Sequence, residues 1–144
     1  MISALRPALI FGALGLVLSC LILAGHAAGS DWWSIVVASG VAAFAVSYVL
    51  WRALCSPVRP RSARRGALAG ALTGVLAHPV AWYLAVVWTY LRSRPMFPGG
   101  KPVGPIEGLS VSLVYAFFGL ILTGWLTLPA GAIAGWLLAR RRRD

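Results

Sequence analysis

The sequence predicts an all-α, polytopic integral membrane protein with four transmembrane helices in an antiparallel bundle. Hydrophobic residues make up 60% of the chain and charged residues only 11%. The apolar residues fall in four long runs, and most charges lie between the runs. Arginines gather at alternate ends of these runs, as the positive-inside rule describes. The 144 residues have room for a single transmembrane domain and no separate soluble domain.

The length of each run justifies one crossing, because a helix needs about 20 residues to span a bilayer core. The first run covers residues 7–28, the second residues 33–54 and the third residues 66–91. The fourth covers residues 109–139 and is longer than one crossing requires. A fifth crossing would place the basic tail opposite the basic loop, so we expect one tilted or kinked helix through Pro129.

The first run also has the outline of a signal peptide, with Arg6 before it and small residues after it. Its apolar stretch is longer than a typical signal core, so we expect it to remain as a helix. Whether it is cleaved stays open. Cys20 within this run and Cys55 at the end of the second should lie far apart in depth, and no metal-binding spacing surrounds them. We therefore expect no disulfide, no metal and no cofactor.

The connection at residues 92–108 contains four prolines among four glycines. Such a segment is expected to form no helix, and its missing amide donors disfavour a sheet. We expect an extracytoplasmic connector. The alternative is a docking loop for a partner.

Basic residues set the predicted orientation. Ten of the thirteen lie at Arg6, in the loop of residues 52–65 and in the tail, which places both termini in the cytoplasm, most readily of a bacterial inner membrane. The net charge of +10 does not indicate nucleic-acid binding, because the arginines flank apolar runs instead of covering a polar face. The candidate contacts to anionic lipid headgroups are Arg52, Arg59, Arg61, Arg64, Arg65, Arg140, Arg141, Arg142 and Arg143.

Small residues recur at every fourth position on two runs. The stripes are Gly66, Gly70 and Gly74 on the third run, and Thr123, Thr127, Gly131 and Gly135 on the fourth. Small residues at this spacing let two helix backbones approach closely in lipid. Both stripes fall in the cytoplasmic half of their helices, so we expect the third and fourth helices to pack there. The alternative is that one stripe faces a second copy of the chain.

One strongly ionisable side chain, His78, falls near the predicted bilayer centre, at a depth similar to Thr127 and Thr123. Pro79 and Pro129 each remove a backbone donor nearby, so two helices are predicted to be interrupted at this depth. Ionisable groups at such breaks mark binding sites in transporters. A structural role is the competing interpretation, in which a neutral imidazole bridges a threonine or a freed carbonyl.

Three functions follow from these features. The first is a non-catalytic accessory, structural or assembly subunit of a membrane complex, because no catalytic motif or intramembrane carboxylate is present. The second is a small oligomeric channel or transporter with its site around His78. The third is a haem protein ligated by His78, although His26 lies too far away in depth to be the second ligand. We expect the partner to be another membrane protein or a second copy, and no enzyme activity.

Overall fold

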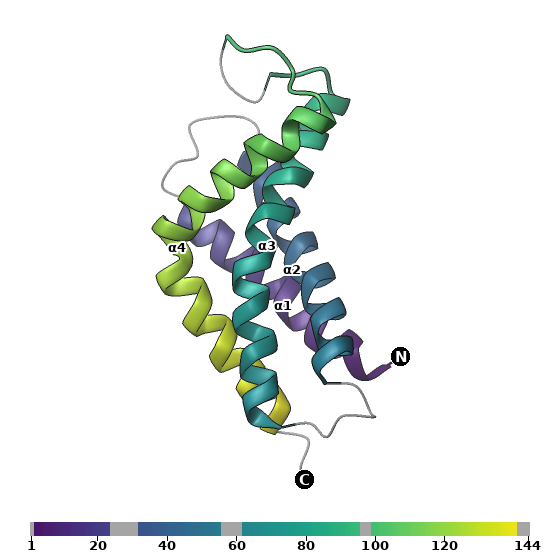
Figure 1. Cartoon of the computed structure of the whole chain (residues 1–144), viewed down its shortest axis with the longest axis vertical. Coiled ribbons are helices and arrows are strands. Elements are labelled where there is room, and N and C mark those ends of the chain that lie inside the picture. Colours follow the sequence, from purple (N-terminus) through teal and green to yellow (C-terminus); the bar gives the residue numbers. More distant parts are fainter. Residues whose placement is uncertain (1, 24–31, 56–61, 96–98, 141–144) are drawn as a thin grey trace.

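A computed structural model describes residues 2–23, 32–55, 62–95 and 99–140. These residues form α-helices and contain no strand (Figure 1). The helices are α1 (Ile2–Leu23), α2 (Trp32–Leu54), α3 (Ala63–Leu91) and α4 (Pro105–Arg140). The predicted all-helical class is confirmed for this part of the chain.

All four helices are long and apolar enough to cross a membrane. The shortest, α1, has 22 residues and α4 has 36. At about 1.5 Å per residue, even α1 reaches the roughly 30 Å of a bilayer core. These lengths and compositions agree with an integral membrane protein.

The distribution of side chains between interior and surface also suits lipid. Ten of the fifteen buried hydrophobic residues are alanines, whereas leucine, isoleucine, valine and aromatic side chains dominate the exposed surface. In water the hydrophobic effect would favour burial of the large apolar side chains, but this driving force is absent in lipid. Small residues are therefore free to occupy the helix contacts and bring the backbones together.

Three helix starts differ from the sequence-based bounds by more than one residue. α1 begins at Ile2, because its buried face, formed by Ala4, Ala8 and Phe11, extends the packing towards the N-terminus. Residues 24–28 of the first predicted run lie outside the described residues. α3 begins at Ala63, where the Ser62 side chain accepts a hydrogen bond from the Arg65 amide at 3.2 Å and caps the helix.

The third difference corrects the prediction that residues 92–108 contain no helix. α4 begins at Pro105, and the Gly108 amide donates to the Gly104 carbonyl at 2.8 Å. Proline is tolerated at the first position of a helix, where its missing amide has no intrahelical acceptor. The proline therefore starts the helix here and does not prevent it.

α4 continues as one helix through Pro129, as expected, and it bends near its middle (Figure 1). The missing amide of Pro129 leaves the Trp125 carbonyl without its usual intrahelical donor, which accounts for a bend at this level. Pro79 likewise lies inside the continuous helix α3. The two prolines are therefore sites of weakened hydrogen bonding within intact helices, not the interruptions that the sequence suggested.

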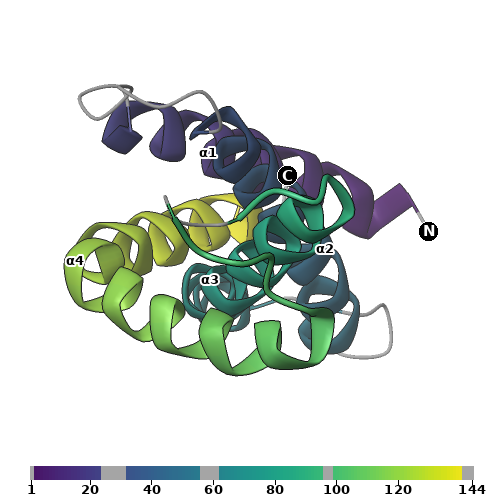
Figure 2. The same cartoon turned by 90° about the horizontal axis from the view of Figure 1, so that it is seen from above.

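The helices pack in chain order: α1 against α2, α2 against α3, and α3 against α4. α1 and α4 touch only slightly. In Figure 2 the C-terminal, yellow part of α4 lies nearer to α1 than its N-terminal, green part does. A buried cluster at one end joins all four elements through Phe11 of α1, Trp51 and Cys55 at the end of α2, Ala69 of α3 and Ala139 of α4. This end also carries the start of α1 and the end of α4 (Figure 1).

Candidate functional site

The two small-residue stripes face each other across the α3–α4 contact. A Cβ atom added to Gly70 would collide with the carbonyl oxygen of Gly131, and one added to Gly66 would collide with that of Gly135. At Gly74 an added Cβ would lie 2.8 Å from the Thr127 carbonyl oxygen. Backbone therefore touches backbone, and no side chain fits between the helices at these positions.

This contact has an antiparallel register with a step of four residues on each helix. Gly66 faces Gly135, Gly70 faces Gly131, and Gly74 faces Thr127. One further step along α3 is His78, and one further step back along α4 is Thr123. The register thus brings His78 to Thr123, one turn away from Thr127.

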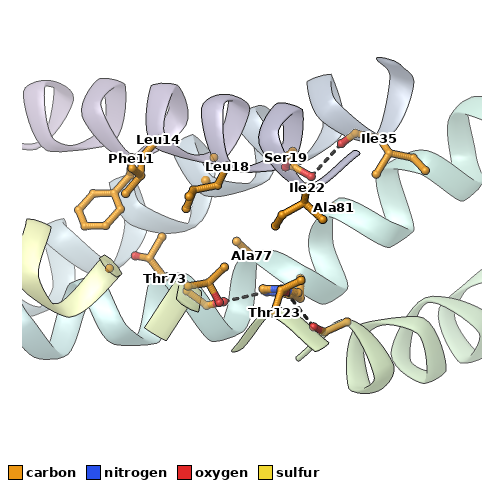
Figure 3. A pocket seen from close by; sticks show the side chains of 18 of the residues that line it. Phe11, Leu14, Leu18, Ser19, Ile22, Ile35, Thr73, Ala77, Ala81 and Thr123 are labelled. Atoms are coloured by element: carbon orange, nitrogen blue, oxygen red, sulfur yellow. Dashed lines mark hydrogen bonds between the residues drawn. The ribbon is translucent and has the colours of Figure 1, made fainter. Parts of the chain in front are cut away.

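The imidazole of His78 bridges the two helices. Its Nε2 lies 3.0 Å from the Thr123 hydroxyl oxygen, and its Nδ1 lies 2.8 Å from the Gly74 carbonyl oxygen of its own helix (Figure 3). The expected carbonyl acceptor was one freed by a proline, but the Gly74 carbonyl is not the one that Pro79 frees. His78 contacts it because residues four apart lie on the same helix face.

The protons on His78 and Thr123 determine which group donates in each hydrogen bond of the bridge. A carbonyl only accepts, so Nδ1 carries a proton and donates it to Gly74. The Thr123 hydroxyl lies 2.8 Å from the Gly119 carbonyl and has one proton to share between that carbonyl and Nε2. In the neutral ring, Nε2 accepts from Thr123. In the doubly protonated ring, Nε2 donates to Thr123, which then donates to Gly119, so the bridge persists in both states.

A cavity of about 200 Å³ lies beside this bridge, between α1 and α4, with α2 and α3 also contributing to its wall. In Figure 3, Leu14, Leu18 and Ile22 extend from α1 on one side, and Ala77 lies on the opposite side. Most lining residues are apolar. The polar ones, tryptophan apart, are Ser19, Ser39, Thr73, His78, Thr123 and Thr127. The lining contains no carboxylate, so it suits an apolar occupant better than a hydrated ion.

One hydroxyl in this lining stands apart. Ser39 and Thr73 each donate to a carbonyl of their own helix at 2.8 Å, and the Thr123 hydroxyl is paired with the Gly119 carbonyl and with His78. Thr127 differs: its Oγ1 is buried and has no hydrogen-bond partner among the described residues. A buried hydroxyl left unpaired costs about 1–3 kcal/mol. Thr127, predicted only as a possible partner of His78, is therefore an unsatisfied polar group at the cavity wall.

The sequence interpretation missed the contribution of the first two helices to this site. Ser19 and Ser39 line the cavity, and sequence alone showed them as scattered serines. Gly12, Gly15 and Gly40 could have indicated a close contact between the first two helices. A Cβ added to Gly15 would lie 2.9 Å from the Ala43 side chain, which shows how closely α1 and α2 approach.

The prolines and basic residues lie outside the cavity lining. Pro79 is half-buried, Pro129 is exposed, and neither ring contributes to the wall. Arg52, Arg64 and Arg140 are exposed at one end of the molecule. Arg59, Arg61, Arg141, Arg142, Arg143 and the alternative haem ligand His26 lie outside the described residues.

Two arginine side chains lie over tryptophan rings, one near each end of the molecule. The Arg140 guanidinium lies 5.0 Å from the Trp136 ring centroid, and that of Arg92, at the other end, lies 4.5 Å from Trp88. Such pairs suit the two headgroup levels of a bilayer, where aromatic and basic residues concentrate. Trp51, at the same end as Trp136, is only 3% exposed and packs between helices.

The haem hypothesis meets a specific obstacle in this geometry. Both ring nitrogens of His78 are within hydrogen-bond distance of protein oxygens. Iron binding would require Nε2 to lose its hydrogen bond to Thr123, because Nδ1 is hydrogen-bonded to the Gly74 carbonyl.

Comparisons with protein families, with curated proteins and with solved structures find no match to this chain. The function is therefore inferred from the residues themselves.

Proposed function

We propose that this chain is a non-catalytic accessory or assembly subunit of a membrane complex. Both termini lie on the cytoplasmic side of a bacterial inner membrane in this proposal. The orientation is supported by the excess of arginine at the end where α1 begins and α4 ends, since basic residues remain on the cytoplasmic side during insertion. Arg52, Arg64 and Arg140 then reach anionic headgroups from that face.

The observation that carries the accessory role is an aromatic surface in the middle of α4. It consists of Phe117, Phe118, Ile121, Leu122 and Trp125, all exposed. Trp125 is 73% exposed and lies within three residues of the helix midpoint. Tryptophan facing lipid normally lies at the headgroup level, whereas exposed aromatic residues are typical of protein interfaces.

The polar atom of Trp125 is already satisfied, because its indole N–H donates to the Leu122 carbonyl at 2.8 Å. The ring therefore presents a purely apolar face. Phe117 and Phe118, with ring centroids 5.9 Å apart in an edge-to-face arrangement, extend this face along the helix. We infer that a transmembrane helix of another membrane protein packs on it.

The test is native mass spectrometry of the tagged protein, purified from its own host in a mild detergent. We expect a complex with a defined membrane protein that is lost in Trp125→Leu and retained in Trp136→Leu. Trp136 is a matched control because it lies on the same helix, outside the aromatic surface, and is also exposed. A pure homo-oligomer, or a complex insensitive to Trp125→Leu, would refute the proposal; the homo-oligomer would favour the channel or transporter instead.

A further inference from the structure

We propose that the cavity between α1 and α4 binds a membrane-soluble compound made of one ring that carries an oxygen substituent. The oxygen pairs with the Thr127 hydroxyl, and the ring occupies the apolar part of the cavity. This site is independent of the accessory role, because it lies between helices of the chain itself and not on the aromatic surface of α4.

The size of the cavity fits a single ring. Its volume is about 200 Å³. A cavity of about 150 Å³ lined by leucine, isoleucine and phenylalanine side chains binds benzene. The present cavity is therefore large enough for a benzene ring with one or two small substituents.

The wall chemistry selects a mostly apolar occupant. Phe11, Leu14, Leu18 and Trp82 provide apolar and aromatic surface from two different helices. Aromatic side chains favour edge-to-face and offset contacts with another ring. At Gly119 the place of a side chain is taken by the His78 and Trp82 rings, 3.3 and 3.4 Å from an added Cβ, so these rings form the wall there.

Thr127 supplies the polar contact. Its Oγ1 is buried and unpartnered in the described part of the chain, whereas the Thr73 hydroxyl donates to Ala69 and the Thr123 hydroxyl is paired with Gly119 and His78. A hydroxyl both donates and accepts, so it can pair with a phenol or a carbonyl oxygen. A ligand with such an oxygen satisfies a group that the protein leaves unsatisfied.

The route of entry is from the bilayer. α1 and α4 meet near the buried cluster of Ala4 and Ala139 and make little contact elsewhere. The cavity is lined by α1 residues from Phe11 onwards and by α4 residues up to Gly131, so it lies next to this cluster, where α1 and α4 make little contact (Figure 3). A compound already dissolved in lipid enters sideways and does not have to cross the charged end of the protein.

The experiment uses two probes of similar shape, 4-fluorophenol and 4-fluorotoluene, whose binding is measured by ¹⁹F NMR in lipid nanodiscs, with empty nanodiscs as the partition control. The full-length protein should bind 4-fluorophenol more tightly. Thr127→Val should weaken 4-fluorophenol by about two- to tenfold, the value of one hydrogen bond, and leave 4-fluorotoluene unchanged. Thr89→Val removes a hydroxyl that donates to the Val86 carbonyl at 2.9 Å and lies outside the cavity lining, so it should leave both affinities unchanged.

Two further variants test the cavity and the Thr127 hydroxyl separately. Ala77→Leu fills the cavity and should abolish binding of both probes, and Thr127→Ser keeps the hydroxyl and should keep the preference for the phenol. Equal binding of the two probes by the unaltered protein would overturn the role of Thr127, and a water molecule at Oγ1 would then be the better account. Binding that survives Ala77→Leu would place the probes elsewhere and overturn the site itself.

Discussion

The α3–α4 contact makes a sharp prediction about glycine substitution. Gly70→Ala adds one methyl group where the nearest atom is the Gly131 carbonyl oxygen. That atom belongs to the backbone, so it cannot rotate away as a side chain would. The helices must separate, and the other backbone contacts of the stripe must loosen with them.

The structure sets the scale of this separation. At the neighbouring Gly74, an added Cβ would lie 2.8 Å from the Thr127 oxygen, and ordinary contact begins at 3.4 Å, so α4 would have to retreat by about 0.6 Å. The collision at Gly70 is more severe. Overpacking of this kind costs about 1–3 kcal/mol. The intrinsic helix preference of alanine over glycine returns about 1 kcal/mol, which leaves a net destabilisation of up to about 2 kcal/mol.

Gly124 on α4 provides the matched control. It is also buried, but a Cβ there would meet only Leu120 and Leu128 side chains, none closer than 3.7 Å. Gly124→Ala should therefore be neutral or stabilising by up to about 1 kcal/mol. The assay is reversible unfolding by SDS in mixed micelles, followed by circular dichroism. Equal unfolding midpoints for Gly70→Ala and Gly124→Ala would refute the reasoning.

Three other predictions follow from the described geometry. His78→Leu removes the bridge, but the Thr123 hydroxyl can still donate to Gly119. The free energy of unfolding measured in SDS should therefore fall by only about 0.6–1.7 kcal/mol, and a larger loss would mean that His78 makes a further stabilising contact. Fusion of alkaline phosphatase after Lys101 should give an active enzyme and fusion after Asp144 an inactive one, whereas the reverse result would invert the proposed orientation. A hydrophobic maleimide in detergent should label exposed Cys20 and spare buried Cys55, so that Cys20→Ser abolishes labelling measured by mass spectrometry.

The helices themselves were predictable because lipid imposes long, uninterrupted apolar runs. The errors fell at helix ends, where local hydrogen bonding decides. Ser62 caps α3 earlier than the apolar run begins, and Pro105 starts α4 inside a segment that its proline content marked as loop. Hydropathy does not register either effect.

The site was predictable only in part. Glycine spacing placed the third and fourth helices in contact, and the same spacing continued to His78 and Thr123 accounts for the bridge. Depth alone could not choose between Thr123 and Thr127, because that choice depends on register to within one turn. The cavity could not be predicted from the sequence, since it depends on the angle between α1 and α4. No single residue on either helix determines that angle.

The same glycines form close helix contacts and part of the cavity wall. Glycine lets α1 approach α2 at Gly15 and lets α3 approach α4 at Gly74 and Gly131, and these three residues also line the cavity. At each of them the neighbouring helix already occupies the place of a side chain, so the glycine contributes only backbone to the wall. Because α1 and α4 make little contact, the cavity beside these close approaches is reachable from the lipid. Substitutions at these glycines should therefore weaken helix packing and alter cavity binding together, whereas Thr127→Val should weaken phenol binding without loss of stability, because it removes an unpaired buried hydroxyl.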